Sequence, residues 1–293
     1  MTEFFITPKP MIKFSFCLIL ILSICSRNSQ AQTASSHSLT KALRAVYQLD
    51  YKPDSTVTTR KTAQLILRVN NDVSSFRSYR KFIFDSIYSI SQDLSYQERI
   101  QRSFNASRKG GKDDFSYTII KTIQKKLISY HDNISAVDYQ YQETYNQFIW
   151  QTTSVKKNIA GHECQQAYTT FAGRVWEAWF TRDIPVSDGP YKFCGLPGLV
   201  LQVRDTHDNY VFTLLCVDTS PVSFDATVDT GVPLSAKSTA VVVSKSKFIE
   251  AKYGSDATIL ERIASQGNQV PESLKQNHTM MLKHRNNPLE LRP

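Results

Sequence analysis

The stretch from Gly189 to Asp205 is the part of the sequence that most constrains the fold. It reads GPYKFCGLPGL and continues VLQVRD. Pro197 fixes its own φ at a value that suits the second position of a β-turn, and Gly198 can adopt the positive φ that a type II turn requires next. From Leu199 onward, apolar residues recur at every second position, which is the period of a strand with one apolar face. The stretch therefore predicts turns followed by a strand, with structural rather than chemical roles for its side chains.

The same two-residue period recurs on both sides of this stretch, and it is interrupted by segments with helical spacing. The alternation predicts strands over residues 39–51, 62–69, 117–128, 149–150, 167–171, 175–181, 199–205, 211–217 and 239–243. Spacings of three and four residues predict helical segments over residues 76–90 and 94–104, and again after two candidate N-caps, Ser244 and Ser255.

This pattern favours an α+β protein that is mainly β. We expect one strongly curved antiparallel sheet, a half-barrel or open barrel, with a few helices packed against it or across its mouth. The expected layout is similar to that of periplasmic lipoprotein carriers, and this likeness concerns the fold alone.

An export signal is expected at the start of the chain. Residues 14–24 form an apolar run directly after Lys13, and Ser29-Gln30-Ala31 offers a cleavage site with small residues. The run is shorter than the about 20 apolar residues that cross a membrane. A lipoprotein signal ending at Cys25 stays open as an alternative, but the bulky Ile24 favours cleavage after Ala31. We therefore expect a periplasmic or secreted protein without a transmembrane segment in its mature form.

Composition sets the domain organisation and the class of partner. Residues 1–31 are expected to be the signal peptide, residues 32–270 a single β-rich domain, and residues 271–293 a polar, poorly ordered tail. The net charge of the sequence is +9, but its basic residues are scattered and do not interleave with aromatic ones. Nucleic acid is therefore not expected as a partner, whereas an outer-membrane protein or an apolar or peptide-like ligand is compatible with the sequence.

Short blocks before and within the Gly189–Asp205 stretch carry a family resemblance. The hexapeptide ending at Val200 is GLPGLV, and the blocks upstream are IAGHECQQA from residue 159, FAGR from 171, AWFT from 178 and GPYKF from 189. Together they resemble the GLPGLI family of secreted bacterial proteins, with valine in place of the last isoleucine. The resemblance implies export and no established activity, so no catalytic residue is transferred. Its structural motif falls on Gly189, Pro190, Gly195, Leu196, Pro197, Gly198 and Leu199.

The strand predicted over residues 175–181 supplies the candidate ligand-binding residues. It alternates Trp176 and Phe180 on one face with Glu177 and Trp179 on the other, so both faces carry an indole. Such a strand is either buried on both faces or lines a concave surface, for which the polar edge of tryptophan is suited. Glu177 is the one acid in this apolar strand, and its pKa would rise if it faced a cavity.

The cysteines that remain after export are Cys164, Cys194 and Cys216. Three thiols allow one disulfide at most within a chain, and the sequence does not rank the three pairings. The alternative is that these cysteines are small apolar core residues, as cysteines in strands often are.

Few residue patterns point to a reaction. His162 and Cys164 share a strand face, and His207 lies in a polar turn, so these three residues are weak metal candidates. The sequence contains no Cys-x-x-Cys, His-Glu-x-x-His, Gly-x-Ser-x-Gly or glycine-rich phosphate loop. We therefore expect no cofactor and no catalytic residue. The function expected is non-enzymatic binding or an accessory role in the cell envelope; the alternatives are a periplasmic hydrolase or metalloenzyme, and a structural partner of an outer-membrane complex.

Overall fold

The computed structural model describes residues 43–111, 114–219, 228 and 240–291. The described residues all belong to one compact unit. The predicted signal peptide, its cleavage site and Cys25 lie outside the described residues.

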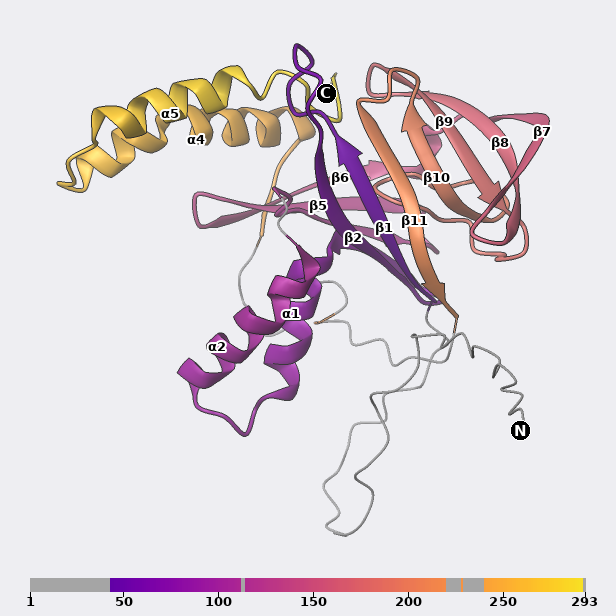
Figure 1. The fold of residues 1–293 in the computed structure, drawn as a ribbon, viewed down its shortest axis with the longest axis horizontal. Coiled ribbons are helices and arrows are strands. Elements are labelled where there is room, and N and C mark those ends of the chain that lie inside the picture. Colours follow the sequence, from indigo (N-terminus) through magenta and orange to yellow (C-terminus); the bar gives the residue numbers. More distant parts are fainter. Residues whose placement is uncertain (1–42, 112–113, 220–227, 229–239, 292–293) are drawn as a thin grey trace, which may run out of the picture. The chain divides into compact units, whose positions relative to one another are not determined.

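Twelve strands of the described residues form one sheet (Figure 1). The sheet has the order β12-β6-β5-β4-β3-β2-β1-β11-β10-β9-β8-β7, and its two ends do not meet. All neighbours are antiparallel except β12 and β6, which are parallel. The strands are β1 Leu43–Tyr51, β2 Lys61–Val69, β3 Val73–Ser78, β4 Thr118–Thr122, β5 Leu127–Ile134, β6 Val137–Thr144, β7 Gln151–Ile159, β8 His162–Phe171, β9 Arg174–Thr181, β10 Leu199–Asp205, β11 Tyr210–Asp218 and β12 Val241–Val242.

The sheet is strongly curved, which confirms the expected open, mainly β architecture. In Figure 1, β5 and β6 run across the direction of β1, β2 and β11. The curved sheet consists of two runs of hairpins, β1 to β6 and β7 to β11, which are joined where β1 pairs with β11. The centre of the sheet is therefore a contact between segments far apart in the sequence.

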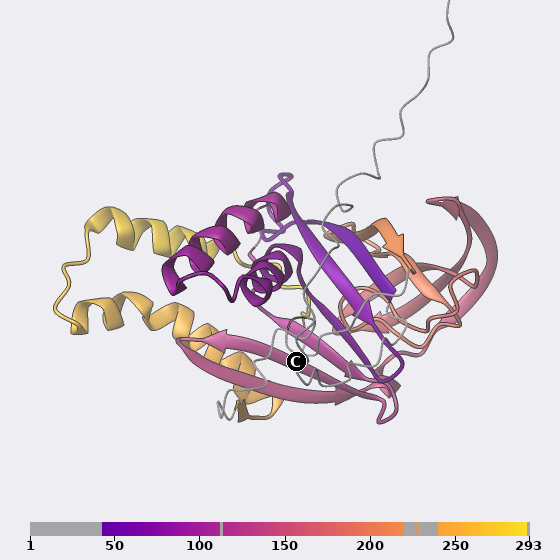
Figure 2. The same ribbon diagram turned by 90° about the horizontal axis from the view of Figure 1, so that it is seen from below.

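Four α-helices of the described residues lie in two hairpins (Figure 2). The first hairpin is α1 Tyr79–Ile90 with α2 Tyr96–Ser107, and the second is α4 Lys245–Ser265 with α5 Glu272–Lys283. Ser95 and Glu98 form a capping box at the start of α2, and the side chain of Ser244 caps α4 as the sequence predicts. Phe248 is the one residue of α4 and α5 that is buried, so this hairpin contacts the sheet near its first turn.

Several predicted boundaries need correction. Phe76 belongs to β3 rather than to the first helix, because its helical spacing to Tyr79 coincides with a strand that enters the helix directly. Residues 149–150 precede β7 instead of forming a strand. Ser255 does not begin a second helix, since α4 continues through it.

The predicted poorly ordered tail is corrected as well. Residues 272–283 form α5, with Glu272 in the first turn and Lys283 in the last, where these charges favour a helix. Beyond α5, the side chains of Asn287 and Leu289 are buried. The polar composition of this segment favours disorder, but its polar groups bind residues that are distant in the sequence, such as Arg174.

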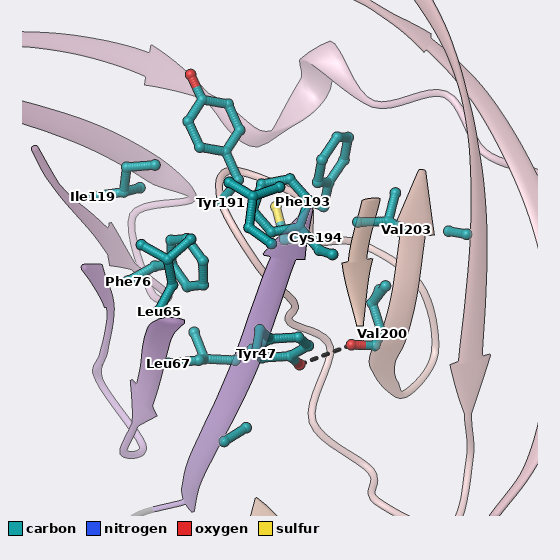
Figure 3. Packing of buried hydrophobic residues seen from close by; sticks show 14 of the residues in the cluster. Tyr47, Leu65, Leu67, Phe76, Ile119, Tyr191, Phe193, Cys194, Val200 and Val203 are labelled. Atoms are coloured by element: carbon teal, nitrogen blue, oxygen red, sulfur yellow. Dashed lines mark hydrogen bonds between the residues drawn. The ribbon is translucent and has the colours of Figure 1, made fainter. Parts of the chain in front are cut away.

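One apolar core lies on the inner face of the curved sheet. Tyr47, Phe76 and Phe212 from three strands are fully buried there, and their rings make edge-on contacts. The Tyr47 hydroxyl donates a hydrogen bond of 2.8 Å to the carbonyl oxygen of Val200 (Figure 3). The same figure shows Tyr191, Phe193 and Cys194 of the 189–198 loop beside these strand residues, so the loop is part of the core.

Candidate functional site

The loop from Gly189 to Gly198 is fixed by close backbone contacts. The amide of Gly198 donates to the carbonyl of Leu196 at 2.8 Å, which is a tighter turn around Pro197 than the predicted type II turn. Gly198 has a φ of 153°, and a Cβ atom there would overlap the Thr181 carbonyl. A Cβ atom on Gly189 would lie 2.7 Å from the Cβ of Val200. The glycines of this motif therefore allow the loop to approach β9 and β10.

A buried lysine of the sheet, Lys121, also binds this loop. Lys121 of β4 is fully buried, and its ammonium pairs with Asp188. The same ammonium donates to the carbonyl oxygens of Gly189 and Phe193 at 3.0 and 3.3 Å. These bonds satisfy the charge and hold the loop with its side chains turned into the core.

The loop places the buried Lys192 at the centre of a polar cluster, which we call the lysine site: Lys192, Lys245, Glu143 and Glu290, with the hydroxyls of Tyr141 and Tyr191. Lys192 is fully buried and pairs with Glu143 and with Glu290, the latter at 2.6 Å. Lys245 pairs with the same two carboxylates at 2.9 and 2.6 Å. Two ammonium groups and two carboxylates therefore alternate in one cluster. Because the four charges come from β6, α4, the loop and the end of the chain, only the folded domain assembles them.

Aromatic rings surround the Lys192 ammonium. Its nitrogen lies 4.9 Å from the ring centroid of Tyr141, 5.4 Å from that of Tyr130, 5.5 Å from that of Tyr191 and 5.8 Å from that of Phe171. Rings at these distances attract a cation through their quadrupoles. The Lys192 charge is thus stabilised by both carboxylates and rings, away from water.

The electrostatics of the lysine site favour charged carboxylates. Burial by itself would raise the pKa of Glu290, but the ammonium groups of Lys192 and Lys245 hold the pKa below its ordinary value. Burial likewise opposes the charged form of Lys245, yet Glu290 and Glu143 raise its pKa. The pKa of Tyr191 is raised well above its usual value by burial and by Glu290, so its hydroxyl stays protonated and donates to that carboxylate.

Glu290 reaches the lysine site as part of residues 284–291, which we call the C-terminal strap. Arg174 donates to the carbonyls of Pro288 and Leu289 at 2.7 and 3.0 Å. The hydroxyl of Tyr210 donates to the Asn287 carbonyl at 2.6 Å. Further bonds link the strap to Lys52, Pro53, Asp54 and Ala172. Figure 1 shows this end of the chain beside the turn that joins β1 and β2. The strap is thus bound through its backbone and also through its side chains, among them those of Asn286, Asn287 and Glu290.

The four candidate ligand residues on β9 do not form one site. Trp176 and Phe180 are fully buried on the inner face, where the Trp176 ring lies 4.8 Å from that of Phe193. Glu177 and Trp179 lie on the other face, and the Trp179 indole donates to Glu177 at 2.6 Å. Burial opposes the charged form of Glu177, but bonds from Trp179 and Arg204 lower its pKa overall. The pKa therefore shifts in the direction opposite to that expected for a cavity acid.

The histidines and cysteines are dispersed. His162 lies 3.2 Å from Asp183, and His207 is exposed in the turn between β10 and β11. The part of the chain that the structure describes has no group of three or more potential metal ligands. Its three cysteines are free: Cys164 and Cys194 are buried, and Cys216 is exposed. Cys216 turns outward because a bulge in β11 shifts the register between Leu214 and Cys216, which removes it from the expected face.

A shallow hollow of about 260 Å³ lies at the other end of β1 from the strap. It is lined by Leu43, Val69, Asn70, Asn71, Asp183, Ile184, Pro185, Val186 and Thr219. None of the predicted binding residues borders it.

The chain is similar to an uncharacterised family over part of its length and to solved structures in its fold. A family model described as a protein of unknown function (Porph_ging) matches residues 115–202, a segment that includes the 189–198 loop and Lys192. The match supports an uncharacterised family for this segment, and the GLPGLI resemblance remains an expectation. No curated protein matches the chain. No helix among the described residues is long and apolar enough to span a membrane.

Among solved structures, PNGF-II resembles the chain in fold. Its structures in space groups C2 and P21 align with TM-scores of 0.50 and 0.51 at 13% identity. They cover 73% and 74% of this chain but 33% and 34% of PNGF-II, so the chain spans about a third of its length. A Vibrio parahaemolyticus domain described as an outer membrane lipoprotein-sorting protein aligns over 65% of this chain and 90% of its own, at 6% identity. Its TM-score of 0.23 is too low to compare the folds.

The lysine site lies outside the residues that the sequence pattern marks as candidates. The stretch from Gly189 predicts structural roles for its side chains, whereas Lys192 stands between Tyr191 and Phe193 inside an otherwise apolar run. A lysine flanked by two aromatics at a predicted core position is the signal that could have indicated a buried charge. No comparable signal marks Lys245, Glu143 or Glu290, because their neighbourhood exists only in the folded chain.

Proposed function

We propose that this chain is an exported, non-enzymatic binding protein that holds a ligand with apolar parts on the inner face of its open sheet, at the lysine site. The observation that carries the proposal is the full burial of the Lys192 ammonium among four aromatic rings and two carboxylates. A buried ion pair adds little net stability compared with apolar side chains of the same size. A charged and aromatic site on a sheet is, in contrast, suited to orienting a ligand.

The test is native mass spectrometry of the protein purified from its own cells or medium, compared with the same sample after unfolding. We expect an adduct that is lost on unfolding. The adduct should also be lost in a Lys192→Gln variant and kept in Lys275→Gln, which changes an exposed lysine of α5. A bare chain in every sample, or an adduct unaffected by Lys192→Gln, contradicts the proposal. The unfolded mass also reports the cleavage site and any disulfide.

A second candidate function is that of a partner in an envelope complex, and the helical hairpins favour it. Apolar side chains are exposed on both hairpins: Ile90, Tyr96 and Phe104 on the first, and Tyr253, Leu274, Met280, Met281 and Leu282 on the second. Exposed apolar residues gathered on one element are typical of protein contacts. This function predicts that the protein elutes in a larger complex and carries no small ligand.

A further inference from the structure

The charge of the lysine site depends on the C-terminal strap. With the strap docked, the two ammonium groups face two carboxylates, Glu143 and Glu290. Without the strap, Lys192 and Lys245 would share only Glu143 among the described residues. A buried cation without a partner is costly, so the undocked site would favour another carboxylate at the position of Glu290.

The surroundings of this position bind backbone groups of the strap on both sides of Glu290. Arg174 and Tyr210 bind backbone carbonyls of the strap, and the amide of Leu291 donates to the Ala172 carbonyl at 2.9 Å. Backbone contacts of this kind do not depend on the side chains of the bound segment. Leu289, directly before Glu290, is buried, so the site accepts an apolar residue next to the acid.

The strap is not a strand of the sheet. Residues 285–291 have no helical or strand assignment, and their backbone is held by separate hydrogen bonds rather than by a ladder. Such a segment can leave without breaking the pairing of the sheet. Because it is tethered through α5, it competes with other ligands at a local concentration on the order of millimolar.

We propose that the lysine site and the surface around Arg174 are a receptor for an acidic peptide, and that the C-terminal strap occupies this receptor in the absence of that peptide. The peptide is an extended segment with a carboxylate side chain beside an apolar residue. Its carboxylate takes the place of Glu290 between Lys192 and Lys245. The inference rests on the proposed function and names the chemistry of its ligand.

The test uses a labelled peptide with the sequence of residues 284–293 and the full chain with a weakened strap, Asn287→Ala/Leu289→Ala/Glu290→Gln. Fluorescence anisotropy should show binding to this variant and at least about tenfold weaker binding to the wild-type chain, whose own strap competes. Replacing glutamate by glutamine in the peptide should weaken binding by about tenfold or more, because hydrogen bonds to a charged group are lost. Adding Lys192→Gln to the variant should have a similar effect.

Three outcomes would overturn the inference. The peptide fails to bind a weakened-strap variant that still unfolds cooperatively; the glutamine peptide binds that variant as tightly as the glutamate peptide; or the variant binds laurate, an apolar chain with a carboxylate, but not the peptide. If the variant does not fold, amide hydrogen exchange of the wild-type chain tests the inference instead. Excess peptide should then speed exchange of the Leu291 amide, while the glutamine peptide should leave it unchanged, and equal rates refute the inference. A native adduct without a carboxylate would refute this inference and leave the proposed function standing.

Discussion

Lys192 and Glu290 should be strongly coupled in stability if the C-terminal strap docks as described. Replacing Lys192 by methionine keeps most of the apolar part of the side chain but removes the ammonium, which leaves Glu143 and Glu290 facing Lys245 alone. Breaking a buried ion pair by removing one partner costs about 3–5 kcal/mol. Because Lys245 still contacts both carboxylates at 2.6 and 2.9 Å, we expect a cost near the lower end, about 3 kcal/mol.

The second variant of the cycle, Glu290→Gln, removes a charge and keeps the shape. Its amide can still accept hydrogen bonds from Lys192 and Tyr191, so we expect a loss of about 1.5–3 kcal/mol, the contribution of hydrogen bonds to a charged group. In the double variant, Lys245 and Glu143 remain as one neutral pair. The double variant should therefore be more stable than the sum of the two single effects predicts, by at least about 1 kcal/mol.

Urea unfolding followed by tryptophan fluorescence measures these energies, since the buried Trp176 ring contacts Phe193 next to Lys192. Glu250→Gln is the matched control, because it removes an exposed glutamate of α4 beyond the first turn and should change stability by less than about 0.5 kcal/mol. Additive effects of the two site variants, within about 0.5 kcal/mol, would refute the reasoning, because residues in direct contact are expected to deviate from additivity.

Three further predictions follow from the same contacts. Gly198→Ala should lower the melting temperature because its Cβ would overlap the Thr181 carbonyl, whereas Gly254→Ala, in open space within α4, should raise it slightly. Lys192 and Lys245 hold the pKa of Glu290 in the folded protein below the ordinary value of 4.5. The charged Glu290 therefore stabilises the fold fully above pH 4.5, and this stabilisation is lost as the pH falls through the lowered pKa. The urea midpoint should accordingly fall in acid more in the wild type than in Glu290→Gln. Burial raises the pKa of Cys164 to about 11 and that of Cys194 to about 12, so peptide mapping after brief alkylation should find the label on Cys216, and equal labelling of all three would contradict the burial.

The sequence predicted the sheet well because alternation and turn residues are local signals. β1, β2, β10 and the start of α4 at Ser244 lie within a few residues of their expected places. The strand expected after the hexapeptide is β10, although the turn around Pro197 is tighter than the one predicted. Local patterns succeed here because each strand buries the face that its period indicates.

The lysine site could not be predicted in the same way. Its charges come from four separate segments, and a lysine or glutamate in isolation is expected on the surface. The bulge that turns Cys216 outward likewise depends on pairing with β1, which a single strand does not disclose. The division of the candidate residues on β9 between two faces does follow from the sequence, because it is the alternation of a single strand.

The pairing of β1 with β11 also bears on the order of folding. Leu49 lies opposite Phe212, so the middle of the sheet cannot form until most of the chain has been synthesised. Contacts between such distant segments slow folding, because a long loop must close before they form. Until then β1 presents an unpaired edge, to which other chains could add. We therefore expect an incomplete chain that ends before β11 to be prone to aggregation and to depend on chaperones.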